Sequence, residues 1–246
     1  MILEIEHLSK SFGGLMAIHE LSLSVQEGEI LGLIGPNGSG KTTLFNLISG
    51  LLKPSIGRIK LSGVDITALP CHKICQMGIA RTFQLTKPFS QMTSSGNVMV
   101  GKAFGCHSTW SMKGARIEAE RILEFTGLKD KSMARAGTLS IAERKRLEIA
   151  RALATHPRLL LLDEMMAGLT PTEVEEAMRL VKKIRDSGVT MIVVEHVMEA
   201  MLGISDRIIA ISAGEKIAEG PPKDVVYNDK VIEAYLGKEE DGKFSV

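Results

Sequence analysis

A glycine-rich segment that joins an apolar run to a helical pattern constrains this chain most. Residues 35–43 read Gly-Pro-Asn-Gly-Ser-Gly-Lys-Thr-Thr, directly after Ile30–Ile34 and before an amphipathic stretch at 44–50. Glycines let consecutive backbone N–H groups converge on an anion, and a helix that begins there points its positive end at the same anion. Lys41 adds a cation for the β- and γ-phosphates, and Thr42 adds a hydroxyl for Mg²⁺. The segment therefore predicts a loop that binds a nucleoside triphosphate through Gly35, Pro36, Asn37, Gly38, Ser39, Gly40, Lys41, Thr42 and Thr43.

Composition narrows the class of protein without naming it. The 246 residues are 44% hydrophobic and 24% charged, which is ordinary for a soluble globular chain. Thirty basic residues against 29 acidic ones give a net charge of +1, so we expect no nucleic-acid partner held by bulk charge. Apolar runs such as Leu159–Leu162 are too short to span a bilayer.

Two further features bear on location and redox chemistry. The start of the chain, Met1–Glu6, alternates like a strand and lacks the pattern of a secretion signal. We therefore expect a cytosolic protein whose membrane contact goes through a partner. Of the three cysteines, Cys71 and Cys75 could share a helix face, but no further ligands complete a metal set, so we expect incidental thiols.

Apolar patterning predicts a parallel sheet with helical connections. Leu159–Leu162 and Val189–Val194, separated by the helical pattern Thr172–Ser187, predict two buried strands joined by a helix. Alternating residues at 2–8 and 21–25 predict two strands before the glycine-rich loop. The other expected elements are a strand at Gly57–Gly63, helices at Ala115–Phe125, Ala142–Ala154 and Lys223–Leu236, and a hairpin of Arg207–Ala213 and Glu215–Glu219.

An acidic pair follows one of the buried strands. Asp163 and Glu164 come directly after Leu159–Leu162, at a strand end where ligands of open α/β sheets bind. Asp163 is placed to hold Mg²⁺ through its water shell, and Glu164 to polarise an attacking water as a general base. The pair alone could simply open a loop. A phosphate-binding lysine 122 residues upstream (163 minus 41) favours the catalytic interpretation, and this long gap argues against small GTPases and simple nucleotide kinases.

Further motifs, in order along the chain, resemble those of the ATP-binding subunit of ATP-binding-cassette (ABC) proteins. The matching positions are Phe12 in Lys-Ser-Phe-Gly, Gln84 in Arg-Thr-Phe-Gln, Ser140 and Ala142 in Leu-Ser-Ile-Ala-Glu, Thr170 in Ala-Gly-Leu-Thr, and His196 in Val-Glu-His. The resemblance implies that Phe12 stacks on adenine, that Gln84 touches Mg²⁺ and the attacking water, and that His196 positions the γ-phosphate. Taken singly, these three could be a core aromatic, a loop residue and a structural histidine. Their joint order favours the functional interpretation.

The segment that matches the ABC signature departs from the usual pattern. Ser140 and Glu143 have the spacing of a helix capping box. The resemblance implies that this helix start faces the γ-phosphate held by the opposite subunit, and that Thr170 offers its hydroxyl across the same interface. Ile141 and Ala142 stand where the family has two glycines. We therefore expect a weakened site here, and a gain in ATPase activity when Gly replaces Ala142.

The resemblance also implies a fold and a domain organisation. It implies an α/β fold: a P-loop NTPase (RecA-like) core with an antiparallel β subdomain and an inserted helical subdomain. A single ABC ATPase domain would cover residues 1–246, with the core and β subdomain at 1–84 and 138–246. The Ser-, Gly-, Thr- and Met-rich stretch at about 85–137 would be the helical insertion.

Several segments resemble the subfamily that serves the uptake of branched-chain and other hydrophobic amino acids. They are Arg81–Gln84, Asn97–Gly101, Glu195-His196 and Val231–Gly237. The resemblance implies ATP and Mg²⁺ as cofactors, integral-membrane permease subunits, a second ATPase subunit (a copy or a paralogue) and, indirectly, an external substrate-binding protein. It places the chain at the cytoplasmic face of the cell membrane. The alternatives are a lipopolysaccharide-export ATPase and an iron–sulphur assembly ATPase.

Overall fold

The computed structural model describes residues 1–83, 88–106 and 111–236, and a six-stranded sheet forms its centre. The strand order is β10-β9-β3-β8-β7-β6, in which the pairs from β9 to β6 are parallel and β10 is antiparallel to β9. The central strands carry apolar side chains toward both faces, as parallel strands covered on two sides do. The strands are β3 (Ile30–Ile34), β6 (Ile79–Arg81), β7 (Leu159–Asp163), β8 (Thr190–Val194), β9 (Arg207–Ser212) and β10 (Glu215–Gly220).

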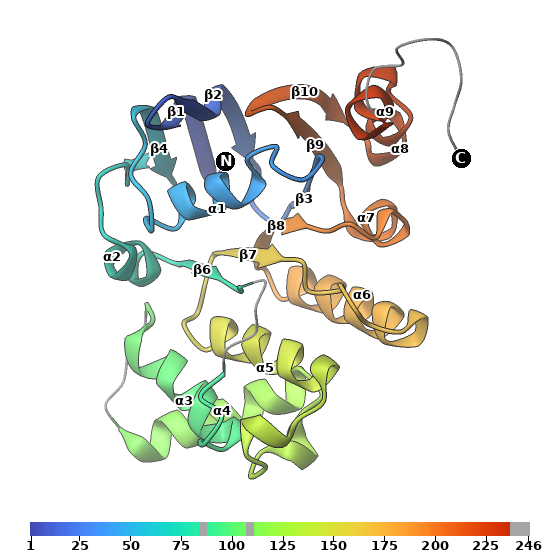
Figure 1. Cartoon of the computed structure of the whole chain (residues 1–246). Coiled ribbons are helices and arrows are strands. Elements are labelled where there is room, and N and C mark those ends of the chain that lie inside the picture. Colours follow the sequence, from blue (N-terminus) through green and yellow to red (C-terminus); the bar gives the residue numbers. More distant parts are fainter. Residues whose placement is uncertain (84–87, 107–110, 237–246) are drawn as a thin grey trace.

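A separate antiparallel sheet has the order β2-β1-β4-β5. Its strands are β1 (Leu3–Phe12), β2 (Leu15–Val25), β4 (Ile56–Leu61) and β5 (Val64–Asp65). The first two form a long hairpin, with Phe12 paired to Leu15 at its tip. This sheet lies at the upper left of Figure 1, beside the larger sheet.

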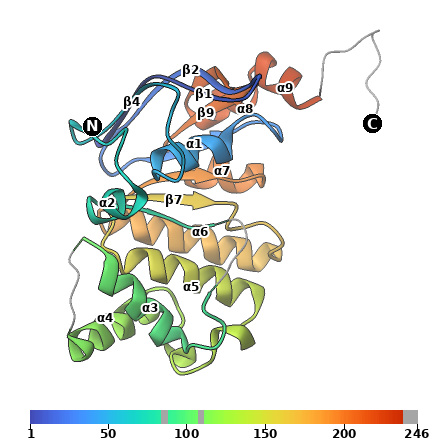
Figure 2. The ribbon, with the colours of Figure 1, turned by 60° about the vertical axis from the view of Figure 1, so that its left-hand side comes forward.

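Helices cover both faces of the central sheet. Alternate residues of β3, β7, β8 and β9 pack against α1 (Lys41–Ile48) and the antiparallel sheet. The intervening residues pack against α5 (Ile141–Leu153), α6 (Pro171–Asp186) and α7 (Met198–Ile204). Figure 2 shows α1 on one side of β7, with α5 and α6 on the other. Two apolar cores therefore sandwich one sheet, as the period-2 alternation of strand side chains requires.

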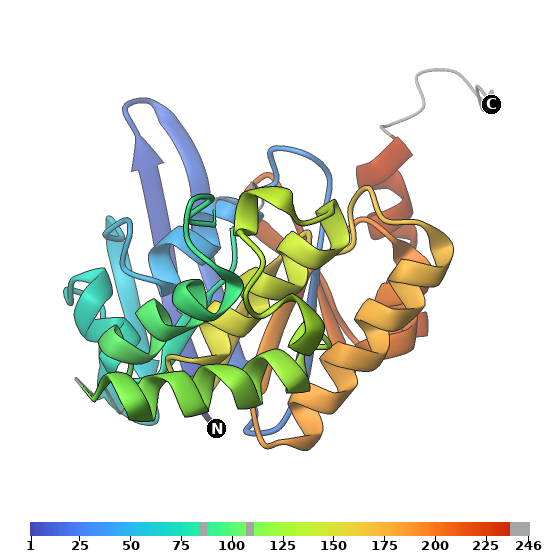
Figure 3. The same ribbon diagram turned by 90° about the horizontal axis from the view of Figure 1, so that it is seen from below.

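A third apolar cluster belongs to the helices at the lower end of the molecule. There α3 (Ser94–Phe104) and α4 (Met112–Phe125) pack against α5, and two 3₁₀ turns (Lys129–Lys131 and Ala136–Thr138) connect α4 to α5. Seen from below, the green α4 lies across the front with the orange α6 beside it (Figure 3). The remaining helices are α2 (Cys71–Gln76), α8 (Pro222–Val226) and α9 (Asp229–Leu236).

The expected fold class is confirmed, with differences in individual elements. The strand expected at 21–25 begins at Leu15, because the hairpin extends beyond the alternating region. The helix expected at Lys223–Leu236 is two helices, because Tyr227 and Asn228 lie outside both and the Asn228 side chain accepts from Lys230 N–H. Helices α2, α3 and α7 and strand β6 were not predicted individually, since they are short or lie in polar sequence.

The division into core and helical insertion stays a prediction. Leu147 and Ala150 of α5 pack into the helical cluster, whereas Ile149 and Ala152 of the same helix pack under the central sheet. Helix α5 therefore belongs physically to both parts. Within the described ranges, no helix is long and apolar enough to cross a bilayer.

Candidate functional site

The glycine-rich loop leaves β3 through a turn that has no room for side chains. Gly35 has φ of +153°, and a Cβ there would lie 2.1 Å from the Ile211 carbonyl oxygen. Gly40, at φ of +107°, would bring a Cβ to 2.6 Å from the carbonyl oxygen of Ala17. These positions require glycine on both conformational and steric grounds. The loop is thus held tightly between β9 and the β1–β2 hairpin.

Lys41 begins α1 and folds back over this loop. Its side-chain ammonium donates to the carbonyl oxygens of Gly35 (2.6 Å) and Pro36 (2.9 Å), and the residue is only 7% exposed. Burial lowers the pKa of Lys41, while the carboxylates of Glu164 and Asp163 act to raise it. Carbonyl groups satisfy hydrogen bonds but do not neutralise a cation, so the buried ammonium keeps a positive charge to offer a phosphate.

The start of α1 supplies further groups suited to a polyphosphate. Its N-cap, Gly40, provides no side-chain cap, and the first turn holds no acidic residue. The first amides of a helix have no intrahelical acceptor and carry the positive end of the helix dipole. Ser39 Oγ is buried and has no hydrogen-bond partner. These orphaned donors fit a bound triphosphate, which the sequence predicted from the same residues.

Asp163 ends β7 in a buried ion pair that sequence reasoning missed. Arg81 Nη2 donates to Asp163 Oδ2 at 2.8 Å, and Arg81 Nη1 donates to Asn46 Oδ1 at 2.5 Å. Both charged side chains are almost fully buried, at 6% and 4% exposure. Arg81 thereby ties the end of β6 to α1 and to the acidic strand end. Nothing local in the sequence distinguishes this arginine from a surface one.

Two side chains of the site carry oxygen atoms of the types that Mg²⁺ prefers as ligands. Asp163 supplies a carboxylate, and Thr42 supplies an exposed hydroxyl at the start of α1. Across the described residues, no three or more His, Cys, Asp or Glu side chains gather in a way that could hold an ion.

Glu164 and His196 meet at the ends of adjacent strands. His196 Nε2 lies 2.9 Å from Glu164 Oε1, and the two side chains are 40% and 16% exposed. Glu164 adopts the left-handed conformation, with φ of +49°, and its amide donates to the Val194 carbonyl at 2.9 Å. The structure therefore brings together these two residues, which were predicted from sequence positions 32 residues apart.

The loop that follows Glu164 is anchored by two buried charged residues. Lys145 Nζ, from α5, donates to the carbonyl oxygens of Glu164 (3.0 Å) and Ala167 (2.6 Å). Glu195 Oε1 accepts from the Met166 amide at 2.7 Å, while Glu195 Oε2 is buried without a partner. Burial raises the pKa of Glu195 to about 7 and lowers that of Lys145. In the sequence, Glu195 stands out only as the neighbour of His196, and nothing local marks Lys145 as a site residue.

The capping box at the start of α5 is confirmed. Ser140 Oγ accepts from the Glu143 amide at 3.2 Å, and Glu143 Oε2 accepts from the Ser140 amide at 2.8 Å. Ala142 is 8% exposed, whereas Ile141 is 61% exposed. The side chain that projects from this helix start is therefore that of Ile141, which redirects the expectation placed on Ala142. The described hydrogen bonds of Ser140 go to Glu143 and Arg144 of its own helix and do not reach the phosphate loop of the same chain.

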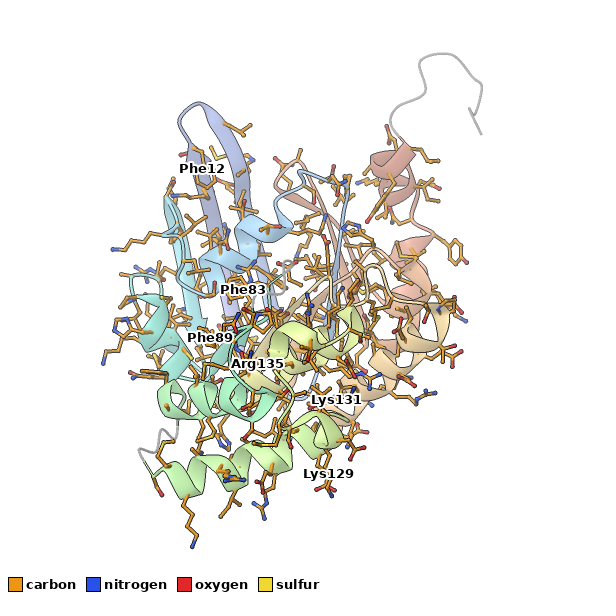
Figure 4. The ribbon with its side chains drawn as sticks, turned by 60° about the horizontal axis from the view of Figure 1, so that its bottom comes forward. Phe12, Phe83, Phe89, Lys129, Lys131 and Arg135 are labelled. Atoms are coloured by element: carbon orange, nitrogen blue, oxygen red, sulfur yellow. The ribbon has the colours of Figure 1, made fainter. Side chains whose placement is uncertain are left out.

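The other predicted residues lie at the hairpin tip, at the start of α6 and outside the described residues. Phe12 projects from the tip of the β1–β2 hairpin (Figure 4), 46% exposed, with Lys10 Nζ 5.1 Å from its ring centroid. The ring is thus partly exposed, with the Lys10 ammonium over it, and its stacking on adenine stays a prediction. Thr170 Oγ1 already donates to Glu173 Oε2 at 2.8 Å and caps α6, so its hydroxyl has a partner within the chain. Gln84 lies outside the described residues.

These observations define a class of protein. The larger sheet is mainly parallel, with a glycine-rich turn suited to an anion after β3 and an acidic pair at the end of β7. This arrangement is that of a P-loop nucleoside triphosphatase. The additional antiparallel sheet and the inserted helical cluster specify the class further.

Family profiles and relatives identify the group within this class. Residues 18–167 match the family described as ABC transporter, and residues 215–241 match the family described as branched-chain amino acid ATP-binding cassette transporter. The chain is 39% identical, over 96% of its length, to the high-affinity branched-chain amino acid transport ATP-binding proteins BraF of Pseudomonas aeruginosa and LivG of Escherichia coli, and covers 98% of each. The chain belongs to the ABC transporter family, as one of its ATP-binding cassettes.

Solved structures agree with this assignment. A nucleotide-free ATP-binding cassette from an ABC transporter superposes with a TM-score of 0.89 at 33% identity, covering 96% of this chain and 99% of its own. The ADP conformation of an ATP-binding cassette superposes with a TM-score of 0.85 at 34% identity, with the same coverage. A dimeric cassette bound to ADP and phosphate superposes with a TM-score of 0.81 at 27% identity, covering 90% of this chain and 99% of its own.

Replacing Glu195 by Gln should weaken the dependence of the unfolding free energy on pH. The folded-state pKa of about 7 exceeds the ordinary value of 4.5, so the folded protein binds this proton more tightly than the unfolded chain does. Stability therefore falls as the pH rises between these values. Above pH 7 the loss is on the order of 3 kcal/mol, at about 1.4 kcal/mol per pKa unit.

Urea unfolding at about pH 5 and about pH 8 measures this effect, and Glu195→Gln should lose less stability between them than the unaltered protein. Glu27→Gln is the matched control, because the Glu27 side chain is 65% exposed. The same pH dependence in all three proteins would rule out Glu195 as its source.

Proposed function

We propose that this chain is the ATP-binding and ATP-hydrolysing subunit of an importer for branched-chain or other hydrophobic amino acids. The observation that carries the proposal is the match of residues 215–241 to the branched-chain family, a segment outside the general cassette match. Identity of 39% to BraF and LivG over nearly the whole chain supports it.

We propose the following roles within one subunit, from the positions of the described residues and from the family resemblance. The Lys41 loop binds the β- and γ-phosphates, and Phe12 stacks on the adenine. Thr42, Asp163 and Gln84 would hold Mg²⁺, which when bound neutralises charge on the β- and γ-phosphates. Glu164 takes a proton from the attacking water, and His196, 2.9 Å away, orients that carboxylate and meets the γ-phosphate.

Two subunits, head to tail, complete the catalytic sites. The start of α5, with Ser140 and the amides near Ala142, faces the γ-phosphate held by the partner, where a helix N-terminus stabilises negative charge. Closure around two ATP molecules moves integral-membrane permease subunits, and hydrolysis reopens the pair. The partner is a second copy or a paralogue, and an external binding protein delivers the amino acid. This places the chain at the cytoplasmic face of the membrane.

A second transport function has one observation in its favour. The chain is 36% identical, over 96% of its length, to the lipopolysaccharide export ATP-binding protein LptB of Acidithiobacillus ferridurans. The match of residues 215–241 to the branched-chain family favours amino-acid uptake over this alternative. The iron–sulphur assembly alternative predicts copurification with soluble assembly proteins instead of with a membrane fraction.

Uptake by living cells tests the transported substrate. Cells that lack this chain should regain uptake of labelled leucine, isoleucine and valine when it is supplied, and not when Glu164→Gln is supplied, since the general base is removed. Glucose uptake serves as the control. Unchanged amino-acid uptake together with a defect in lipopolysaccharide delivery would instead support the export function.

The same Glu164→Gln change should trap the ATP-bound pair. Binding energy stays intact when hydrolysis stops, so Mg-ATP should shift the molecular mass from monomer to dimer by light scattering. Adding Lys41→Ala to this variant is the control, because it removes the phosphate cation and should abolish the shift. A variant that binds ATP yet stays monomeric would contradict a closed homodimer and point to a paralogous partner.

Removing the Ile141 side chain should raise ATP turnover of the paired subunits. Ile141 is the exposed residue at the helix start, and its branched side chain crowds the approach to the partner's nucleotide. We expect Ile141→Gly to at least double kcat, a barrier change on the order of 0.5 kcal/mol. Ala142→Gly is the matched comparison, and should cost about 1 kcal/mol of helix stability without the gain. Equal or lower turnover in Ile141→Gly would contradict the crowding.

A further inference from the structure

The C-terminal helix α9 reaches the first residue of the phosphate loop. The Gly35 amide donates to the phenolic oxygen of Tyr235 at 2.8 Å, across 200 residues of sequence. Gly35 lies one residue beyond β3 and is buried. A buried amide at the end of a strand ladder needs an acceptor, and this one comes from a side chain.

Gly35 is also the residue that receives the phosphate-binding lysine. Its carbonyl oxygen accepts from Lys41 Nζ at 2.6 Å, while its amide donates to Tyr235. The lack of space around Gly35, with the Ile211 carbonyl 2.1 Å from a virtual Cβ, leaves its peptide groups little freedom to turn. The phenol therefore bonds the peptide group on the N-terminal side of Gly35, and Lys41 rests on the peptide group on its C-terminal side. Through the Gly35 Cα that joins the two groups, the phenol helps to set the carbonyl that receives the lysine.

The helix that carries Tyr235 is itself fixed to the core. Val231 is 3% exposed and packs into the core beneath the central sheet, and α9 contacts α8 and β10. The Tyr235 ring is 40% exposed, and burial raises the pKa of its phenol, so the group stays protonated at neutral pH. A packed helix presenting a neutral hydroxyl is a rigid acceptor for the loop amide.

We propose that Tyr235 is a positioning residue for nucleotide binding: its hydroxyl holds Gly35 so that the loop amides and Lys41 are arranged before ATP arrives. The inference rests on the proposed ATP-binding role of this loop and extends it to the C-terminal segment matched by the branched-chain family. The competing interpretation is that the bond only attaches α9 to the core.

The two interpretations differ in what the loss of one oxygen changes. Tyr235→Phe keeps the ring and leaves the Gly35 amide buried without an acceptor, which allows its peptide to turn. Loss of prearrangement weakens ground-state and transition-state binding alike. We therefore expect the dissociation constants of ATP and ADP and the KM for ATP to rise together by about three- to tenfold. The kcat should stay nearly unchanged. A bond that only attached α9 would lower thermal stability and leave nucleotide affinity unchanged.

The chain offers a matched control, because its only other tyrosine is Tyr227, which is 72% exposed. The measurements are calorimetric titration of ATP without Mg²⁺, the same titration of ADP, and steady-state ATPase kinetics. They should show weaker nucleotide binding for Tyr235→Phe and unchanged nucleotide binding for Tyr227→Phe. Unchanged affinity in Tyr235→Phe, with or without a lower melting temperature, overturns the proposal. Failure of the unaltered protein to bind ATP would instead refute the proposed function.

A spectroscopic measurement keeps the proposal testable if Tyr235→Phe does not fold. Full-length protein labelled with 3-fluorotyrosine has two ¹⁹F resonances, which Tyr227→Phe assigns. ATP draws Lys41 away from the Gly35 carbonyl, so the Tyr235 resonance should shift on titration while that of Tyr227 stays in place. A Tyr235 resonance unmoved by saturating ATP overturns the proposal.

Discussion

The parallel register of β3, β8 and β7 is the constraint on which the rest of this structure depends. Leu33 of β3 and Asp163 of β7 both pair with Val194 of β8, so the three strands end together. The phosphate loop, the Glu195–His196 pair and the Glu164 loop all begin within a residue or two of that level. Because carboxyl ends of parallel strands share one edge, groups far apart in sequence meet there without any local signal.

That edge is unusually rich in buried charge, and each charge has a fixed role. Lys41 and Asp163 are less than 10% exposed, as is the side chain of Arg81, and each makes hydrogen bonds with a neighbouring element. A buried ion pair gains little net stability over apolar packing, but breaking one partner is costly. This free-energy cost keeps the two strand ends in place, because a backbone shift at β6 or α1 would leave a buried guanidinium or carboxylate unpaired. The left-handed backbone conformation of Glu164 is likewise held by its surroundings, since its carbonyl accepts from Lys145 and its amide donates to Val194.

How much the sequence predicted depends on whether the signal was local. The phosphate loop and the capping box at Ser140 were predictable, because their physics lies within a few consecutive residues. Arg81 and Tyr235 were not, since their partners lie 82 and 200 residues away and nothing nearby distinguishes them. The directions of the side chains at the start of α5 could not be predicted from the motif either. The structure shows that Ile141 is exposed and that Ala142 is buried. The polar sequence around α3 gave no periodicity strong enough to define that helix.

Helix α5 has a mechanical consequence that follows from its two-sided packing. Its exposed N-cap, Ser140, precedes the first helical residue, and one turn into the helix Lys145 donates to the carbonyl oxygens of Glu164 and Ala167. The helix packs both into the core beneath the central sheet and into the helical cluster, and close-packed interiors deform little. A tilt of α5 therefore displaces both of its ends. The backbone of Glu164 and the exposed start of the helix are therefore both attached to α5. A displacement of the helix start at Ser140 is therefore expected to move the backbone of Glu164, and the reverse.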